Sequence, residues 1–152
     1  MPDVLLDTSF LLPTLGLDVR EITTSDMESI RAASKRARLR CSYVSFVEIL
    51  GLVGKVSRKA DAKAVSTGMN SLLASGLYEW TNPTLGAIQL ALELRTKGHK
   101  DNIDNILYAT AAESKMLFLS LDEELRRFLT KNGYDAGLMV KAGELAARVG
   151  MP

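Results

Sequence analysis

The chain has 152 residues, a formal net charge of +1, 47% hydrophobic residues and 24% charged residues. These values are typical of a soluble globular protein, and we expect one domain over residues 1–152. A single cysteine, Cys41, excludes an internal disulfide, and a single histidine, His99, excludes histidine-rich metal sites. No signal-peptide pattern and no apolar run of membrane-spanning length are present, which favours a cytoplasmic protein with no membrane partner.

Short apolar segments alternate with helical patterns along the chain. In chain order we expect a strand at 4–6, a helix from a capping box at 25–28 to about 38, a strand at 39–42, helices at 44–57 and 60–74, a strand at 78–80, helices at 83–97 and 102–115, a strand at 116–120, a helix at 122–131, a strand at 138–140 and a short last helix from 143. The 44–57 segment is apolar nearly all round, which predicts a buried helix. The alternation predicts an α/β fold with a parallel sheet covered on both faces.

Two acidic residues follow predicted strands. Asp7 comes directly after Val4-Leu5-Leu6, and Asp122 follows Met116–Ser120 after one intervening residue. In a parallel α/β sheet, sites form beyond the carboxyl ends of the strands. The two carboxylates therefore lie near the same edge if their strands are neighbours.

Glu48 is a carboxylate on the apolar face of a predicted helix. Val44 and Leu52 lie about 40° on either side of it on a helical wheel. Because Glu48 is expected in the middle of the helix, its side chain cannot cap either helix end. A buried, unpaired carboxylate either takes a raised pKa or binds a cation.

Asp104 lies at the edge of another apolar helical stripe, near the start of the helix. It also fits an ordinary role, because a negative charge there complements the helix N-terminus. Asp7 could likewise cap a helical turn, and Asp122 is a plausible N-cap. Single residues therefore do not decide between structure and function, but the four acids together repel one another unless something neutralises them.

Oxygen ligands without histidine or cysteine select a hard cation, Mg²⁺ or Mn²⁺. Such an ion orients water, lowers its pKa and stabilises a leaving oxygen, and two ions hold both ends of an in-line displacement. This chemistry needs neither a histidine nor a serine nucleophile. It therefore suits a chain with one histidine.

The acids and their flanking residues resemble those of the PIN domain family. The resemblance rests on Asp7-Thr8-Ser9 after the first strand, Glu48 preceded by Val47, the segment 104–111 and Leu119-Ser120-Leu121-Asp122. It spans about residues 4–140. That family includes the VapC-type toxins of toxin–antitoxin pairs and RNA-processing nucleases. The resemblance implies a three-layer α/β/α fold with about five parallel strands, and a ribonuclease dependent on one or two Mg²⁺ or Mn²⁺ ions.

By position, the resemblance also assigns roles to individual residues. The catalytic and metal-binding residues would be Asp7, Glu48, Asp104 and Asp122. The supporting hydroxyl residues would be Thr8, Ser9 and Ser120. Accessory acids would be Asp101 and Glu124, for which a helix cap and a solvated helix residue are the simpler interpretations. The implied partners are an RNA substrate, an antitoxin protein, and further copies of the chain in a homodimer or higher homo-oligomer.

Other interpretations remain open. A non-catalytic PIN-like module that binds RNA or a protein partner is the main alternative, although concentrated negative charge repels phosphate. Residues 31–63 contain nine basic and two acidic residues, which form either solvated helix faces or a phosphate-attracting surface. His99 is most simply a polar residue just past a helix end.

Overall fold

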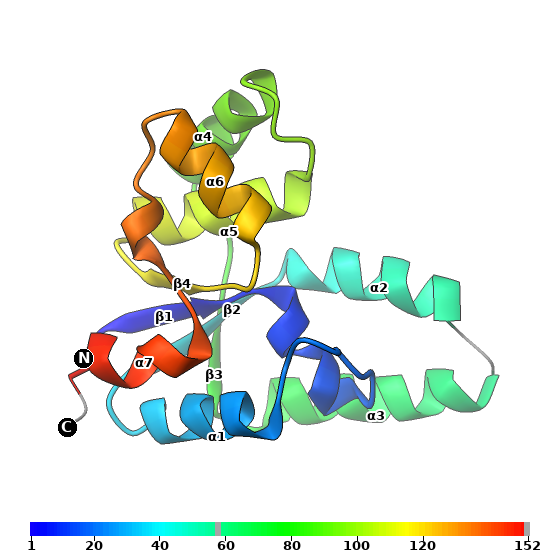
Figure 1. Ribbon diagram of the computed structural model, residues 1–152. Coiled ribbons are helices and arrows are strands. Elements are labelled where there is room, and N and C mark those ends of the chain that lie inside the picture. Colours follow the sequence, from blue (N-terminus) through cyan, green and yellow to red (C-terminus); the bar gives the residue numbers. More distant parts are fainter. Residues whose placement is uncertain (57–58, 151–152) are drawn as a thin grey trace.

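A parallel sheet with strand order β3-β2-β1-β4-β5 lies at the centre of the protein (Figure 1). The computed structural model describes the backbone of residues 1–56 and 59–150 and, in these ranges, the side chains outside 55–61. The strands are β1 (Asp3–Leu6), β2 (Arg38–Ser42), β3 (Tyr78–Thr81), β4 (Leu117–Leu119) and β5 (Met139–Val140). All neighbouring strands are parallel, so the predicted five-stranded parallel sheet is confirmed.

Helices cover both faces of the sheet. They are α1 (Thr24–Ala33), α2 (Ser45–Val56), α3 (Lys59–Ala74), α4 (Leu85–Thr96), α5 (Asn102–Glu113), α6 (Glu123–Lys131) and α7 (Ala142–Arg148), with 3₁₀ turns η1 (Thr8–Phe10), η2 (Leu12–Leu15) and η3 (Ala136–Leu138). In Figure 1, α4, α5 and α6 lie on one side of the sheet, and α1 and α7 lie on the other. The three-layer α/β/α architecture is therefore confirmed.

The central strand β1 is buried on both faces, which explains its uninterrupted apolar sequence. Val4 and Leu6 pack into the core on the side of α1 and α7. Leu5 points the other way and packs with Phe118 against α5 and α6. Alternation of side chains along the strand thus joins the two layers of core through three consecutive residues.

Helix α1 begins and ends earlier than the sequence indicates. Its N-cap is Thr23, whose hydroxyl accepts the N–H of Asp26 while the Asp26 carboxylate accepts the N–H of Thr23. The capping box predicted at 25–28 was therefore wrong by two residues, because an equivalent pair lies just before it. The helix ends at Ala33, since Arg38 is already needed in β2 opposite Asp3 of β1.

The prediction that the second helix is buried all round was wrong. Val47 and Leu50 on α2 are each 64% exposed, whereas Ile49 is fully buried. The reason is that α2 extends away from the sheet in Figure 1, so only one side of it packs against the core. Glu48 also lies in the first turn of α2 and not in the middle of the helix.

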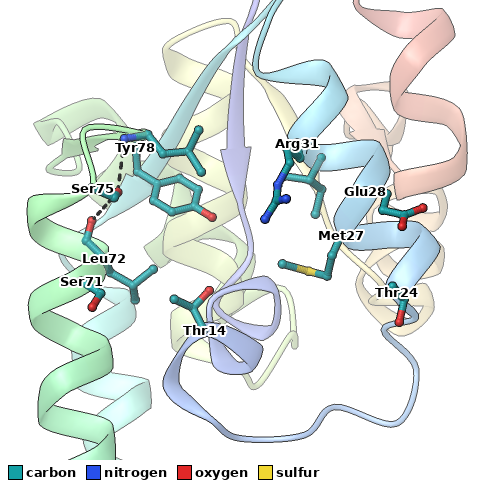
Figure 2. A pocket seen from close by; sticks show the side chains of 11 residues that line it. Thr14, Thr24, Met27, Glu28, Arg31, Ser71, Leu72, Ser75 and Tyr78 are labelled. Atoms are coloured by element: carbon teal, nitrogen blue, oxygen red, sulfur yellow. Dashed lines mark hydrogen bonds between the residues drawn. The ribbon is translucent and has the colours of Figure 1, made fainter.

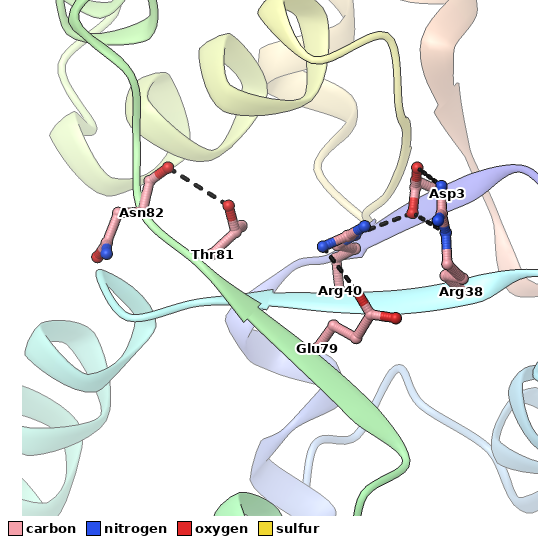
Figure 3. Close-up of polar contacts among 6 residues, drawn as sticks. All are labelled: Asp3, Arg38, Arg40, Glu79, Thr81 and Asn82. Carbon is pink, nitrogen blue, oxygen red and sulfur yellow. Dashed lines mark hydrogen bonds and ion pairs between the residues drawn. The ribbon is translucent and has the colours of Figure 1, made fainter.

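An ion-pair network lies at the amino ends of β1 and β2 (Figure 3). Asp3 accepts hydrogen bonds from Arg38 at 2.8 and 2.9 Å and from Arg40 at 2.8 Å, and Arg40 also pairs with Glu79 at 2.8 Å. These two bases are therefore compensated and stand at the edge of the sheet opposite the end of β1 that carries Asp7. Of the other bases between 31 and 63, Lys55, Arg58 and Lys59 lie outside the described side chains.

We expect Asp3→Asn to lower the free energy of unfolding by about 1–2 kcal/mol, because two charge-assisted hydrogen-bond donors lose their anionic partner. Glu79→Gln is the matched control, since Glu79 is 54% exposed and its ion pair with Arg40 is screened by water. It should change the same free energy by less than about 0.5 kcal/mol. Urea unfolding of both variants measures the difference, and equal losses would contradict the importance given to Asp3.

Candidate metal centre

Four carboxylates from separate parts of the chain line one cavity at the carboxyl edge of the sheet. The cavity has a volume of about 370 Å³ and its acidic lining includes Asp7, Glu48, Asp104 and Asp122. Strands β1 and β4 are hydrogen-bonded neighbours, and the strand order reverses between them. Such a reversal opens a crevice at the carboxyl ends of the strands, which is where open α/β sheets bind ligands.

Asp7 is held at the junction of β1 and β4. Its N–H donates to the carbonyl of Leu119 at 2.9 Å, and the Ser120 hydroxyl donates to its carboxylate at 3.0 Å. Although Asp7 stands at the N-cap of η1, its side chain makes no capping hydrogen bond. Burial, opposed by the Ser120 bond and reinforced by the charges of Glu48 and Asp122, raises the pKa of Asp7 to about 7.

Glu48 brings an unsatisfied carboxylate oxygen to the cavity. Its Oε2 is buried and has no hydrogen-bond partner among the described residues. Burial raises the pKa of Glu48, while the Thr8 hydroxyl opposes the shift. Thr8 is itself fully buried, and its hydroxyl is hydrogen-bonded to that of Ser45 at the start of α2 at 3.1 Å. A buried carboxylate oxygen without a partner is costly unless it is protonated or bound to a cation.

Asp104 and Asp122 stand together at the starts of α5 and α6. Burial and the adjacent Asp122 carboxyl raise the pKa of Asp104 well above its ordinary range, because two close carboxyl groups share a proton more easily than they both ionise. Asp122 caps α6 by accepting the N–H of Leu125 on Oδ1 at 2.8 Å, and its own N–H donates to Ser120 at 3.1 Å. The capping role of Asp122 is therefore real, and it uses only one of the two carboxylate oxygens.

The remaining candidates have different places. Ser9 lines the four-carboxylate cavity. Asp101 is the N-cap of α5 and accepts the N–H groups of Ile103 and Asp104 at 3.0 and 3.1 Å, and it also lines the cavity. Glu124 is exposed and does not reach this cavity, but it lines a second one beside it.

The second cavity, of about 540 Å³, shares Asp101, Asp104 and Asp122 with the first. His99 also lines it, and this histidine is only 6% exposed. The interpretation of His99 as an ordinary polar residue past a helix end therefore missed its burial beside the acids. Asn105, which lies on the side of its helix opposite the predicted apolar stripe, proves to be fully buried and bonded to His99, so the sequence pattern gave no signal for this contact.

The chemistry of these side chains fits a divalent cation. None of the ion pairs formed by the described side chains involves Asp7, Glu48, Asp104 or Asp122, so their negative charge is not compensated by a base. The oxygen donors suit Mg²⁺ or Mn²⁺. The orphaned Oε2 of Glu48 supports the same conclusion.

A third cavity, of about 420 Å³, lies away from the four carboxylates, between α1 and α3 (Figure 2). Met27 and Arg31 of α1 face the ring of Tyr78 of β3 across it. Among its lining residues the one carboxylate is Glu28. This mainly apolar space lacks the converging oxygen donors of the four-carboxylate cavity, so it does not compete as a metal centre.

The comparisons with known proteins agree with this fold. The family model described as PIN domain matches residues 4–129. A chain from the VapBC2 complex of Rickettsia felis, bound to a DNA fragment from its promoter, superposes with a TM-score of 0.67 and 13% identity, covering 91% of this chain and 98% of that one. A chain from the DNA-bound VapBC of Salmonella typhimurium gives 0.62 and 14%, covering 93% and 99%.

A chain from FitAcB of Neisseria gonorrhoeae gives a TM-score of 0.56 and 14% identity, covering 91% of this chain and 95% of that one. At these identities the similarity concerns the fold. No curated protein matches the chain by sequence. In the part of the chain that the structure describes, every helix is too short or too polar to cross a membrane.

We expect the metal-free protein to lose stability as the pH rises. The folded state binds more protons than the unfolded state between pH about 4, where unfolded aspartates titrate, and the raised pKa of Asp7 at about 7. The free energy of unfolding therefore falls over this range, by up to about 1.4 kcal/mol per pH unit for each extra proton. Asp104 extends the fall to higher pH, because its pKa is raised further.

Urea unfolding in EDTA from pH 4 to 8 measures this slope. Asp104→Asn should flatten it above pH 7, and saturating Mn²⁺ should remove most of it. A metal-free stability that rises with pH would contradict the assignment of raised carboxyl pKa values.

Proposed function

The chain belongs to the PIN domain family, and we propose that it is a divalent-metal-dependent ribonuclease that hydrolyses RNA phosphodiester bonds. The observation that carries this proposal is the convergence of four carboxylates that pair with no base among the described side chains, one of them with a buried oxygen that lacks a partner among the described residues. This arrangement is unfavourable in a protein that has no cation to bind. The same arrangement suits a protein that cleaves phosphodiester bonds, because such a protein needs to bind metal ions.

The carboxylates have different proposed roles according to their positions in the cavity. Asp7, Asp104 and Asp122 would hold one or two Mg²⁺ or Mn²⁺ ions, and Ser120 fixes Asp7 and Asp122 relative to each other through its hydroxyl. A bound divalent ion supplies the Lewis acidity that activates water and stabilises the leaving oxygen. Glu48 completes the ligand set or accepts a hydrogen bond from the attacking water. In-line attack on phosphorus then leaves a 5′-phosphate and a 3′-hydroxyl.

Two of the nine bases in the segment 31–63 are poorly placed to guide RNA to the acids. Arg38 and Arg40 are paired with Asp3 at the opposite edge of the sheet, so they do not guide the strand to the acids. Lys100 lines the second cavity beside Asp101 and is better placed to attract a phosphate. Until a cation is bound, the uncompensated carboxylates repel the backbone of the substrate.

We propose the toxin of a toxin–antitoxin pair as the physiological role, with an antitoxin protein as partner. The support is that the similar solved chains come from structures described as VapBC and toxin–antitoxin complexes. The alternative is a non-catalytic PIN-like module that binds RNA or a protein partner. Metal-dependent cleavage separates the two.

We expect cleavage of a mixed set of labelled RNAs with Mn²⁺ or Mg²⁺, and none with EDTA. Asp7→Asn should lower the rate by more than about 100-fold, because a ligand carboxylate is lost while the side-chain shape is kept. Glu28→Gln, an exposed carboxylate change on α1, is the matched control and should cut at the rate of the wild type. Gel analysis of the products with end-group labelling also tests for the 5′-phosphate.

Two negative outcomes have different meanings. Absence of cleavage without a Mn²⁺-dependent thermal shift would favour the non-catalytic alternative. Absence of cleavage with a clear Mn²⁺ shift would keep the metal centre and reject the RNA set as substrate.

A second copy of the chain is the other partner we propose, with α4 as its contact surface. Leu85, Ile88 and Leu92 are 75%, 43% and 63% exposed and recur at the spacing of one helix face. A row of exposed large apolar side chains on one face is typical of a protein contact. We expect the double variant Leu85→Glu, Leu92→Glu to weaken the dimer at least about tenfold in dissociation constant.

Analytical ultracentrifugation over a concentration series measures this change. Leu73→Glu on α3, at a leucine that is 48% exposed, is the control and should leave the association unchanged. A wild-type protein that is monomeric at high concentration, or a double variant that still associates, would reject this surface.

A further inference from the structure

His99, the one histidine of the chain, is buried beside the acids. His99 lies in the connection between α4 and α5, after Gly98, which has a φ of +113°. Its ring packs on Phe128 of α6 with 5.1 Å between ring centroids, and the residue is 6% exposed. Burial of an imidazole at a turn is costly, so its polar atoms need partners.

Asn105 fixes the proton on one side of the ring. Its Nδ2 donates to the backbone carbonyl of His99 at 3.0 Å, which turns its Oδ1 toward the ring, 2.7 Å from Nδ1. An amide oxygen only accepts hydrogen bonds, so Nδ1 carries the hydrogen. In the neutral ring the other nitrogen, Nε2, then carries a free lone pair.

His99 lines the second cavity together with Asp104 and Asp122. A ring nitrogen of His99 and carboxylate oxygens of Asp104 and Asp122 all lie within 4.8 Å of one another. Nδ1 is engaged by Asn105, and the described side chains offer Nε2 neither a hydrogen bond nor an ion pair. Ligand atoms held at about 2.1 Å by one ion are up to about 4.2 Å apart, so side-chain shifts below 1 Å would close this set around an ion.

We propose that His99, Asp104 and Asp122 form an outer cation position with an imidazole ligand, which shares Asp104 and Asp122 with the all-oxygen ligand set that also includes Asp7 and Glu48. This inference rests on the metal centre of the proposed function and deepens it. The Asn105 bond is the kind of outer contact that fixes the tautomer and orientation of a metal-binding histidine. A mixed nitrogen and oxygen set favours Mn²⁺, Co²⁺ or Zn²⁺ over Mg²⁺, so the outer position discriminates between ions that the inner one would accept alike.

Pulsed electron paramagnetic resonance of the Mn²⁺-loaded, tag-free chain tests this directly. Because the chain has one histidine, any imidazole ¹⁴N coupling to Mn²⁺ must come from His99. We expect this coupling in the wild type and its loss in His99→Phe, which keeps an aromatic ring against Phe128. Calorimetry should show Mn²⁺ affinity about 10- to 100-fold lower in that variant, with a smaller change for Mg²⁺. Phe128→Leu loosens the ring packing only, and should keep the coupling.

The outcomes separate this inference from the function on which it rests. Bound Mn²⁺ without imidazole coupling overturns the role of His99 and leaves the carboxylate centre intact. Absence of Mn²⁺ binding by the wild type overturns both. The wild-type spectrum alone shows whether His99 binds Mn²⁺, even if His99→Phe fails to fold.

Discussion

The pairing of β1 with β4 is the constraint on which the candidate site depends. It brings Asp7 beside Ser120, residues that are 113 positions apart in sequence, and the 3.0 Å hydrogen bond between them locks the register of the two strand ends. Ser120 also receives the N–H of Asp122, so one hydroxyl sets the spacing of two carboxylates. The strand order reverses between these two strands, which leaves room for a ligand between the helices that follow them.

Helix starts explain how the acids stay together although no described side chain supplies them with a pairing base. Glu48 and Asp104 lie in the first turns of α2 and α5, and Asp101 and Asp122 are N-caps. Backbone N–H groups and the helix dipole put partial positive charge at each of these places, which offsets part of the mutual repulsion. Capping and ion binding are therefore compatible roles of the same carboxylates. The sequence analysis treated these two roles as alternatives, but one carboxylate can serve both.

The local sequence pattern was sufficient to predict much of the fold and the residues of the candidate site. Strand ends and an interrupted apolar face pointed to Asp7, Glu48, Asp104 and Asp122, and the structure brings these four to one cavity, although their chemistry stays a prediction. Three-dimensional contacts decided the rest. The exposure of α2 depends on where the sheet ends, and the burial of His99 depends on Asn105 and on a neighbouring helix. A hydrophobic pattern carries no information about such neighbours.

The proposed ion site would also link the lifetime of the protein to the supply of divalent ions. A ligand that binds the folded state alone increases the population of that state, and here the ion would also relieve stored repulsion. In a cell short of divalent cations, a larger fraction of the chain would open and reach proteases. The ion proposed to activate the protein would thus also protect it from degradation, so that abundance and the proposed activity would fall together when the metal becomes scarce.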